Sequence, residues 1–112
     1  MNLKPIHTIV VDSRTIDDIT IIREDPENYP KGKSNIYAKN FQGDIIWYAE
    51  LPITGDIYCN PIQWNQTINE NADSWNDLYE SDAHSFAVCS WLCFTVAINI
   101  RSGKIIRKVF TK

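Results

Sequence analysis

Two cysteines four residues apart, Cys89 and Cys93, have the spacing best suited to metal or thiol chemistry. They lie among β-branched and aromatic residues, which predict a strand rather than a helix. On one strand, residues four apart share a face but lie about 13 Å apart, at 3.3 Å per residue. One zinc ion cannot bind both at that separation. We therefore expect no metal site, and free thiols at both positions and at Cys59.

A Cys–His nucleophile is possible in principle, because Asp82 and His84 lie near the cysteines in sequence. No catalytic motif surrounds any cysteine, and the sequence has no phosphate-binding glycine loop and no dinucleotide-binding motif. We therefore expect no enzyme activity, no catalytic residue and no cofactor. A thiol or hydrolytic enzyme using Cys89 or Cys93 with His84 is the least favoured hypothesis.

The distribution of charge gives a stronger functional signal. The net charge is −3, yet residues 40–100 contain no Lys or Arg and eight acidic residues. Residues 1–39 balance six acidic with six basic residues, and residues 101–112 carry five basic residues and no acidic one. A basic protein partner is therefore expected, and nucleic acid is not expected as a direct ligand.

Tryptophan follows the same distribution, because Trp47, Trp64, Trp75 and Trp91 all lie within residues 40–100. Aromatic side chains anchor protein interfaces, and charges of one sign steer a partner of opposite sign. The alternatives are that the acidic run is only a solvated face and that Trp75 faces a core. The predicted partner-binding residues are Trp64, Glu70, Asp73, Trp75, Asp77, Tyr79, Glu80 and Asp82.

The elements that position these residues are mostly strands. β-branched runs predict strands at residues 7–11 and 19–23. Loops containing Gly43 and Gly103 predict two antiparallel hairpins, which we expect to share one sheet. Residues 86–100 alternate apolar with small side chains, which predicts a central strand that the Ser90-Trp91 pair bends or breaks.

One short helix is expected near residues 71–80, with Asn71 as its cap and Asp73 in its first turn; a long ordered loop is the alternative. The length of 112 residues fits a single domain covering residues 1–112. We predict a mainly β fold, an antiparallel meander or small β-sandwich of about six to eight strands with that helix.

No run of 18 apolar residues is present, so no membrane-spanning helix is expected. The first residues lack the apolar core of a signal peptide. With an odd number of cysteines, these features predict a cytoplasmic protein with no membrane partner.

Two segments carry a resemblance. Residues 35–47 (NIYAKNFQGDIIW) resemble the strand-turn-strand of a quinoprotein-type propeller blade, and residues 98–106 (INIRSGKII) are similar to a second turn of such blades. The chain has room for about two blades, which excludes a full propeller. Over residues 35–112 it resembles small bacterial proteins with a single blade-like β-meander. Some of these look like immunity proteins of contact-dependent growth inhibition, or polymorphic toxin, systems.

The resemblance implies a toxin inhibitor, and the acidic charge supports it independently. The first hypothesis is therefore a cytoplasmic immunity-type protein that occludes the active site of a cognate toxin, a basic nuclease. The second is a small-ligand or carbohydrate-binding β module that uses exposed Trp64, Trp75 or Trp91 for stacking.

Overall fold

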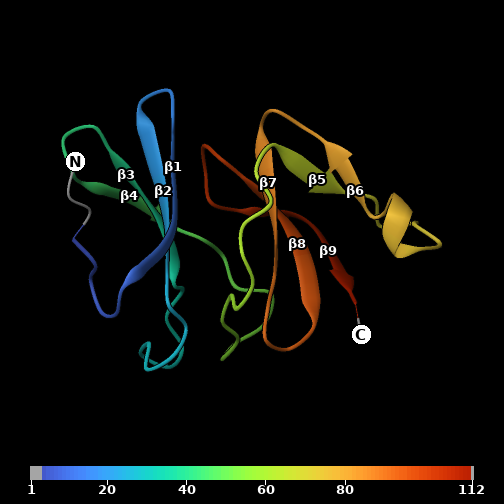
Figure 1. The fold of residues 1–112 in the computed structure, drawn as a ribbon, viewed down its shortest axis with the longest axis horizontal. Helices are drawn as coiled ribbons and strands as arrows, with labels where there is room; N and C mark the ends of the chain where they lie inside the picture. Colours follow the sequence, from blue (N-terminus) through green and yellow to red (C-terminus); the bar gives the residue numbers. More distant parts are fainter. Residues whose placement is uncertain (1–3, 112) are drawn as a thin grey trace.

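The computed structural model describes residues 4–111, which form a mainly β structure with extents of 41 × 30 × 18 Å. This confirms the predicted fold class. The nine strands in this part of the chain, two of them of three residues, exceed the six to eight expected (Figure 1). The elements are β1 (Val10–Ile16), β2 (Ile19–Glu24), β3 (Ile36–Asn40), β4 (Ile45–Tyr48), β5 (Gln66–Ile68), the 3-10 helix η1 (Trp75–Asp77), β6 (Tyr79–Ser81), β7 (Ser85–Cys89), β8 (Phe94–Asn99) and β9 (Ile105–Phe110).

The first sheet is an antiparallel meander in the order β1-β2-β3-β4. Side chains alternate across each strand. Ile21 and Ala38 therefore face the second sheet, whereas Ile22 and Tyr37 face the other way. All four side chains are fully buried, so the centre of this sheet is covered on both faces.

The second sheet is antiparallel in the order β7-β8-β9. The segment before β5 borders β7 through a bridge between Gln63 and Ala87, and a second bridge joins Tyr58 to Ser90 directly after β7. The chain leaves β7 after Cys89 and returns as β8. The predicted strand over residues 86–100 is thus broken at Ser90 and Trp91, as expected, and becomes a hairpin.

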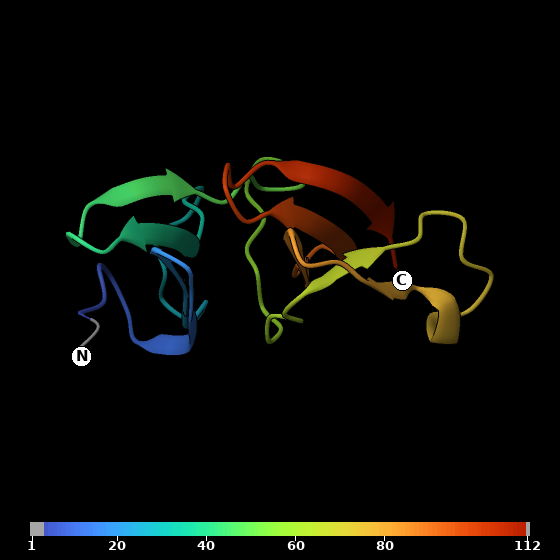
Figure 2. The same cartoon turned by 90° about the horizontal axis from the view of Figure 1, so that it is seen from above.

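The main core lies between these two sheets, which Figure 2 shows side by side. The rings of Trp47 and Phe86 stack there with centroids 6.4 Å apart and planes inclined by 16°. The Trp47 Nε1–H donates a hydrogen bond of 3.1 Å to the carbonyl oxygen of Ile100. The two sheets therefore share one hydrophobic core.

The hairpins at Gly43 and Gly103 are antiparallel as predicted, but the prediction that they share one sheet is wrong. The first hairpin (β3–β4) belongs to the four-stranded sheet and the second (β8–β9) to the three-stranded sheet. Each has an apolar face, and the sheets bury these faces by packing on each other. Gly103 has a φ of +72°, and an added Cβ would lie 2.5 Å from Cε3 of Trp47. Glycine is therefore required at the contact between the sheets.

Each sheet also has an outer cover. The β5–β6 hairpin packs on the second sheet, where Ile68 and Leu78 contact Ala87 and Ala97. The N-terminal segment is hydrogen-bonded to Glu24 of the first sheet.

No helix within residues 4–111 has the length and apolar character needed to cross a membrane.

Candidate partner-binding surface

The acidic hairpin, defined here as residues 66–82, comprises β5, a turn, η1 and β6. Its base is fixed by apolar packing, because Ile68 and Leu78 are buried against the second sheet. Its tip, with η1, extends past the sheets at one end of the longest axis (Figure 1). None of the residues of η1 is buried. The tip therefore exposes its polar and aromatic side chains to solvent.

The helix predicted near residues 71–80 is present only as the single 3-10 turn of η1. The expected cap, Asn71, is wrong: Ser74 occupies the N-cap position, and its side chain makes no capping bond. Instead, the N–H of Asn71 donates to Oδ1 of Asn69 at 3.0 Å. Asn side chains favour such local turns over helix interiors. Tyr79 is extended because it pairs with Ile68 of β5, so a helix cannot continue past Leu78.

Two of the predicted acidic residues have structural partners. Glu80 lies 3.8 Å from Arg107 of β9. Asp82 accepts the backbone N–H of His84 at 2.9 Å and the hydroxyl of Ser85, also at 2.9 Å. The bond from His84 is the largest cause that lowers the pKa of Asp82 below its ordinary value, and it outweighs the opposing effect of burial. These two carboxylates therefore stabilise the hairpin's connection to the second sheet.

The remaining three acidic residues lie nearer the tip. Asp77 accepts only a long bond, 3.3 Å, from the hydroxyl of Ser74. Glu70 and Asp73 are exposed and have no side-chain hydrogen bond or ion pair with any residue in the range 4–111. Two negative charges at the tip are thus uncompensated by the described part of the protein.

A hollow of about 220 Å³ lies between this tip and the end of β9. Trp75 is 60% exposed on one element and Phe110 is 57% exposed on the other. The residues that line it include Glu70, Asp73, Trp75, Leu78 and Val109. The ring of Phe110 packs on that of Phe94, with centroids 5.5 Å apart, on the opposite face of β9 from Val109. Sequence reasoning missed the contribution of β9, because no local pattern connects Val109 with a residue 34 positions earlier.

The structure separates the other predicted aromatic residues from this tip. Trp64 is half-buried against Phe86, 5.9 Å away, and the guanidinium of Arg14 lies 5.1 Å from its ring centroid. Tyr79 is half-buried, and its hydroxyl lies 3.6 Å from Sγ of Cys89. Burial raises the pKa of Tyr79 to about 12. Trp91 is 70% exposed in the β7–β8 turn. Of the predicted aromatic anchors, only Trp75 is therefore exposed beside the acidic residues.

The three cysteines are free thiols. The prediction that Cys93 lies on a strand is wrong, because it occupies the β7–β8 turn with a φ of +70°. Cys89 ends β7 and His84 precedes it, so the two lie about 16 Å apart along an extended chain. A nucleophile pair of Cys89 and His84 is therefore not formed.

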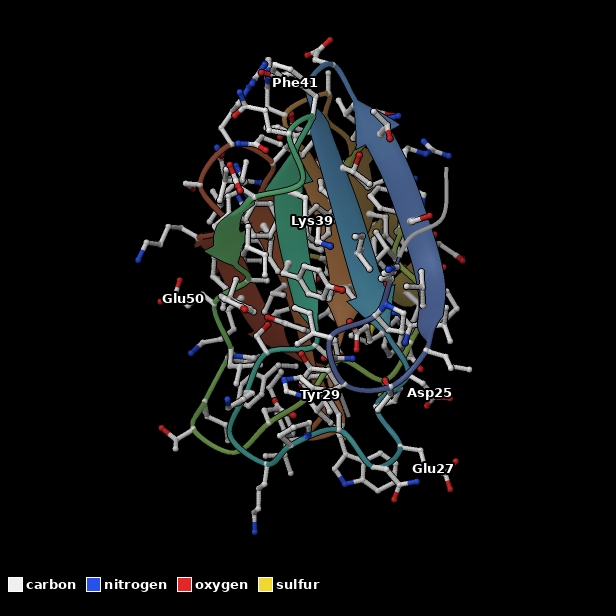
Figure 3. All side chains as sticks on the ribbon, turned by 90° about the vertical axis from the view of Figure 1, so that its left-hand side faces the viewer. Asp25, Glu27, Tyr29, Lys39, Phe41 and Glu50 are labelled. Atoms are coloured by element: carbon white, nitrogen blue, oxygen red, sulfur yellow. The ribbon has the colours of Figure 1, made fainter. Side chains whose placement is uncertain are left out.

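A polar cluster that the sequence did not reveal lies on the outer face of the first sheet, which Figure 3 views from outside. The carboxylate of Glu24 accepts the backbone N–H groups of Ile6, His7 and Thr8, and the Tyr37 hydroxyl. Burial raises the pKa of Glu24, but the four donors together outweigh it, so the pKa lies below its ordinary value. This cluster attaches the N-terminal segment to the sheet.

Within residues 4–111, no group of three or more His, Cys, Asp or Glu side chains is arranged to hold a metal ion. The tip of the acidic hairpin is where an exposed tryptophan lies beside acidic residues that have no side-chain partner in this part of the chain. No protein-family model matches this chain, and neither a curated protein nor a solved structure matches it.

Proposed function

We propose that this chain is an immunity-type protein that neutralises a cognate toxin, a basic nuclease, by occluding its active site. The acidic hairpin makes the contact, in the bacterial cytoplasm. One observation carries the proposal: Trp75 is 60% exposed at a projecting tip, beside Glu70 and Asp73, whose carboxylates have no side-chain partner among residues 4–111.

The exposure of Trp75 separates two interpretations of the acidic run. If the run only solubilised the protein, its tryptophan would be expected against the core, where a large aromatic ring is most stabilising. An exposed tryptophan is instead suited to filling a pocket on a partner. The resemblance of residues 35–47 and 98–106 to blade-like bacterial proteins supports the same role.

The charge of the surface supports a nuclease as the partner. A nuclease must bind phosphates, so its substrate groove is basic. A negatively charged hairpin is attracted to the same groove, and steering by opposite charges speeds association. An inhibitor docked there excludes the nucleic acid by occupying its site.

The test uses the product of the gene adjacent to this one as partner. The double substitution Asp73→Lys with Asp77→Lys should weaken binding at least about tenfold and slow association, because the steering charge is reversed. Association of the wild type should also slow with rising salt. Surface plasmon resonance measures both rate constants, and circular dichroism and thermal melting should show a fold close to wild type.

The matched control places the same change of charge at the opposite end of the molecule. Glu27→Lys with Asp44→Lys replaces two exposed carboxylates away from the acidic hairpin. This variant should bind with near-wild-type affinity. Unchanged affinity and association rate in the folded Asp73→Lys, Asp77→Lys variant would show that the acidic hairpin is not the interface.

A carbohydrate-binding module is the second candidate, and the 70% exposure of Trp91 favours it. Stacking of a sugar on an indole ring depends little on ionic strength, unlike a charge-steered protein complex. An oligosaccharide that shifts the Trp91 indole resonance independently of salt would support this candidate, and a salt-dependent protein partner would support the first.

A further inference from the structure

We propose that the hollow between η1 and the end of β9 is a receptor for one arginine side chain of the protein partner. The inference rests on the proposed function and specifies the chemistry of its contact. The hollow of about 220 Å³ is lined by the exposed aromatic residue Trp75 and by the exposed acidic residues Glu70 and Asp73.

The size of the hollow suits one side chain. Sites for drug-sized ligands have volumes of about 300 Å³ or more, and this hollow is smaller. Leu78 and Val109 add apolar surface that can contact the methylene stem of a long side chain. One long residue that projects from a partner therefore fits better than an independent metabolite.

The chemistry favours a cation with a flat, weakly hydrated head. Glu70 and Asp73 have no side-chain hydrogen bond or ion pair within the described residues and supply negative charge. The exposed ring of Trp75 attracts a cation and stacks with a planar group. A guanidinium satisfies both demands and can donate paired hydrogen bonds to a carboxylate, whereas the compact ammonium of lysine is strongly hydrated and does not stack.

Two arginine side chains of this protein already contact an aromatic ring or a carboxylate of the same chain. Arg14 stacks on the ring of Trp64 at 5.1 Å. Arg107 donates to the carbonyl oxygen of Ile68 at 2.9 Å and lies 3.8 Å from Glu80, on the same acidic hairpin. The hollow offers an aromatic ring and a carboxylate together, as those two sites do separately.

The test is a titration of the 112-residue chain with the tripeptide acetyl-Gly-Arg-Gly-amide, followed by the indole ¹H–¹⁵N resonances. Trp75→Phe assigns the Trp75 signal. The arginine peptide should shift this signal with a dissociation constant of about 1–10 mM, as is usual for one side chain. The Trp91 signal should not move. Peptides with citrulline or lysine in place of arginine should bind at least about fivefold more weakly, because citrulline lacks the positive charge and lysine lacks the planar guanidinium.

A double variant connects the binding to the acidic residues of the hollow. Glu70→Gln with Asp73→Asn should weaken the arginine peptide at least about fivefold, because it removes both carboxylates that a guanidinium would contact. Trp91→Phe is the matched control and should bind as the wild type does.

Equal binding of the three peptides, or no saturable shift of Trp75 in the folded protein, would overturn the arginine site. Either result leaves the proposed function standing if the adjacent-gene product still loses affinity for the Asp73→Lys, Asp77→Lys variant. If the arginine peptide binds as predicted while that protein binds both forms equally, the proposed function fails and the site remains. The two failures are therefore distinguishable.

Discussion

The two ends of the molecule cover a sheet in opposite ways. At one end, the N-terminal segment is attached to the first sheet by a buried carboxylate, that of Glu24, which accepts bonds from three backbone N–H groups and the hydroxyl of Tyr37. At the other end, the acidic hairpin is attached by buried apolar residues, and the carboxylates of Glu70 and Asp73 lie in solvent.

This difference shows how to separate structural from functional charge in one small protein. A buried carboxylate is tolerated only with hydrogen-bond donors around it, and at Glu24 those donors are present. An exposed carboxylate contributes little to folding and repels its like-charged neighbours. The carboxylates of Glu70 and Asp73 therefore contribute little to stability, unlike the buried carboxylate of Glu24.

The largest expected difference in stability is between two substitutions that each neutralise one carboxylate, one at each end of the molecule. Glu24→Gln should lower the free energy of unfolding by about 3 kcal/mol, because an amide cannot accept all four bonds and places its own donor among them. The matched substitution Glu70→Gln should change it by less than about 0.5 kcal/mol. Urea unfolding followed by circular dichroism measures both, and equal losses would remove the contrast between the two ends.

A smaller difference in stability is expected between two single truncations in the acidic hairpin, one of a buried and one of an exposed side chain. Leu78→Ala should lower the free energy of unfolding by about 2 kcal/mol, because it leaves a cavity against the second sheet. Trp75→Ala should change it by less than about 0.5 kcal/mol, although it removes a larger side chain, because that side chain is exposed. Thermal melting gives the comparison. A Trp75→Ala variant as unstable as Leu78→Ala would place Trp75 among the structural residues.

The smallest effect is a change in the response to acid. Because the folded-state pKa of Glu24 lies below its ordinary value of 4.5, its contribution to stability is present above that pH and is lost as the pH falls through the folded-state pKa. The wild type should therefore lose more stability than Glu24→Gln between about pH 6 and about pH 3. Asp82, whose pKa is also lowered, contributes the same dependence of stability on pH to both proteins. Parallel stability curves from urea titrations at each pH would contradict this assignment.

Several features of this protein depend only on residues that are close together in the sequence, and these features were predictable from it. The turns at Gly43 and Gly103 and the break at Ser90 and Trp91 follow from glycine conformation and from interruption of an alternating pattern. The mainly β class follows from the same alternation. The segregation of charge is a property of the sequence itself.

Other features depend on contacts between distant residues, and only the tertiary structure decided them. The alternation of side chains shows that a strand has an apolar face, but not which other strand covers that face. The sequence therefore could not show that the hairpins at Gly43 and Gly103 belong to two facing sheets. The pairing of Tyr79 with β5 replaced the expected helix. Burial likewise depends on what packs against a side chain, so two tryptophans of one acidic stretch differ: Trp64 is half-buried against Phe86 of the core, whereas Trp75 remains exposed at the tip of the acidic hairpin.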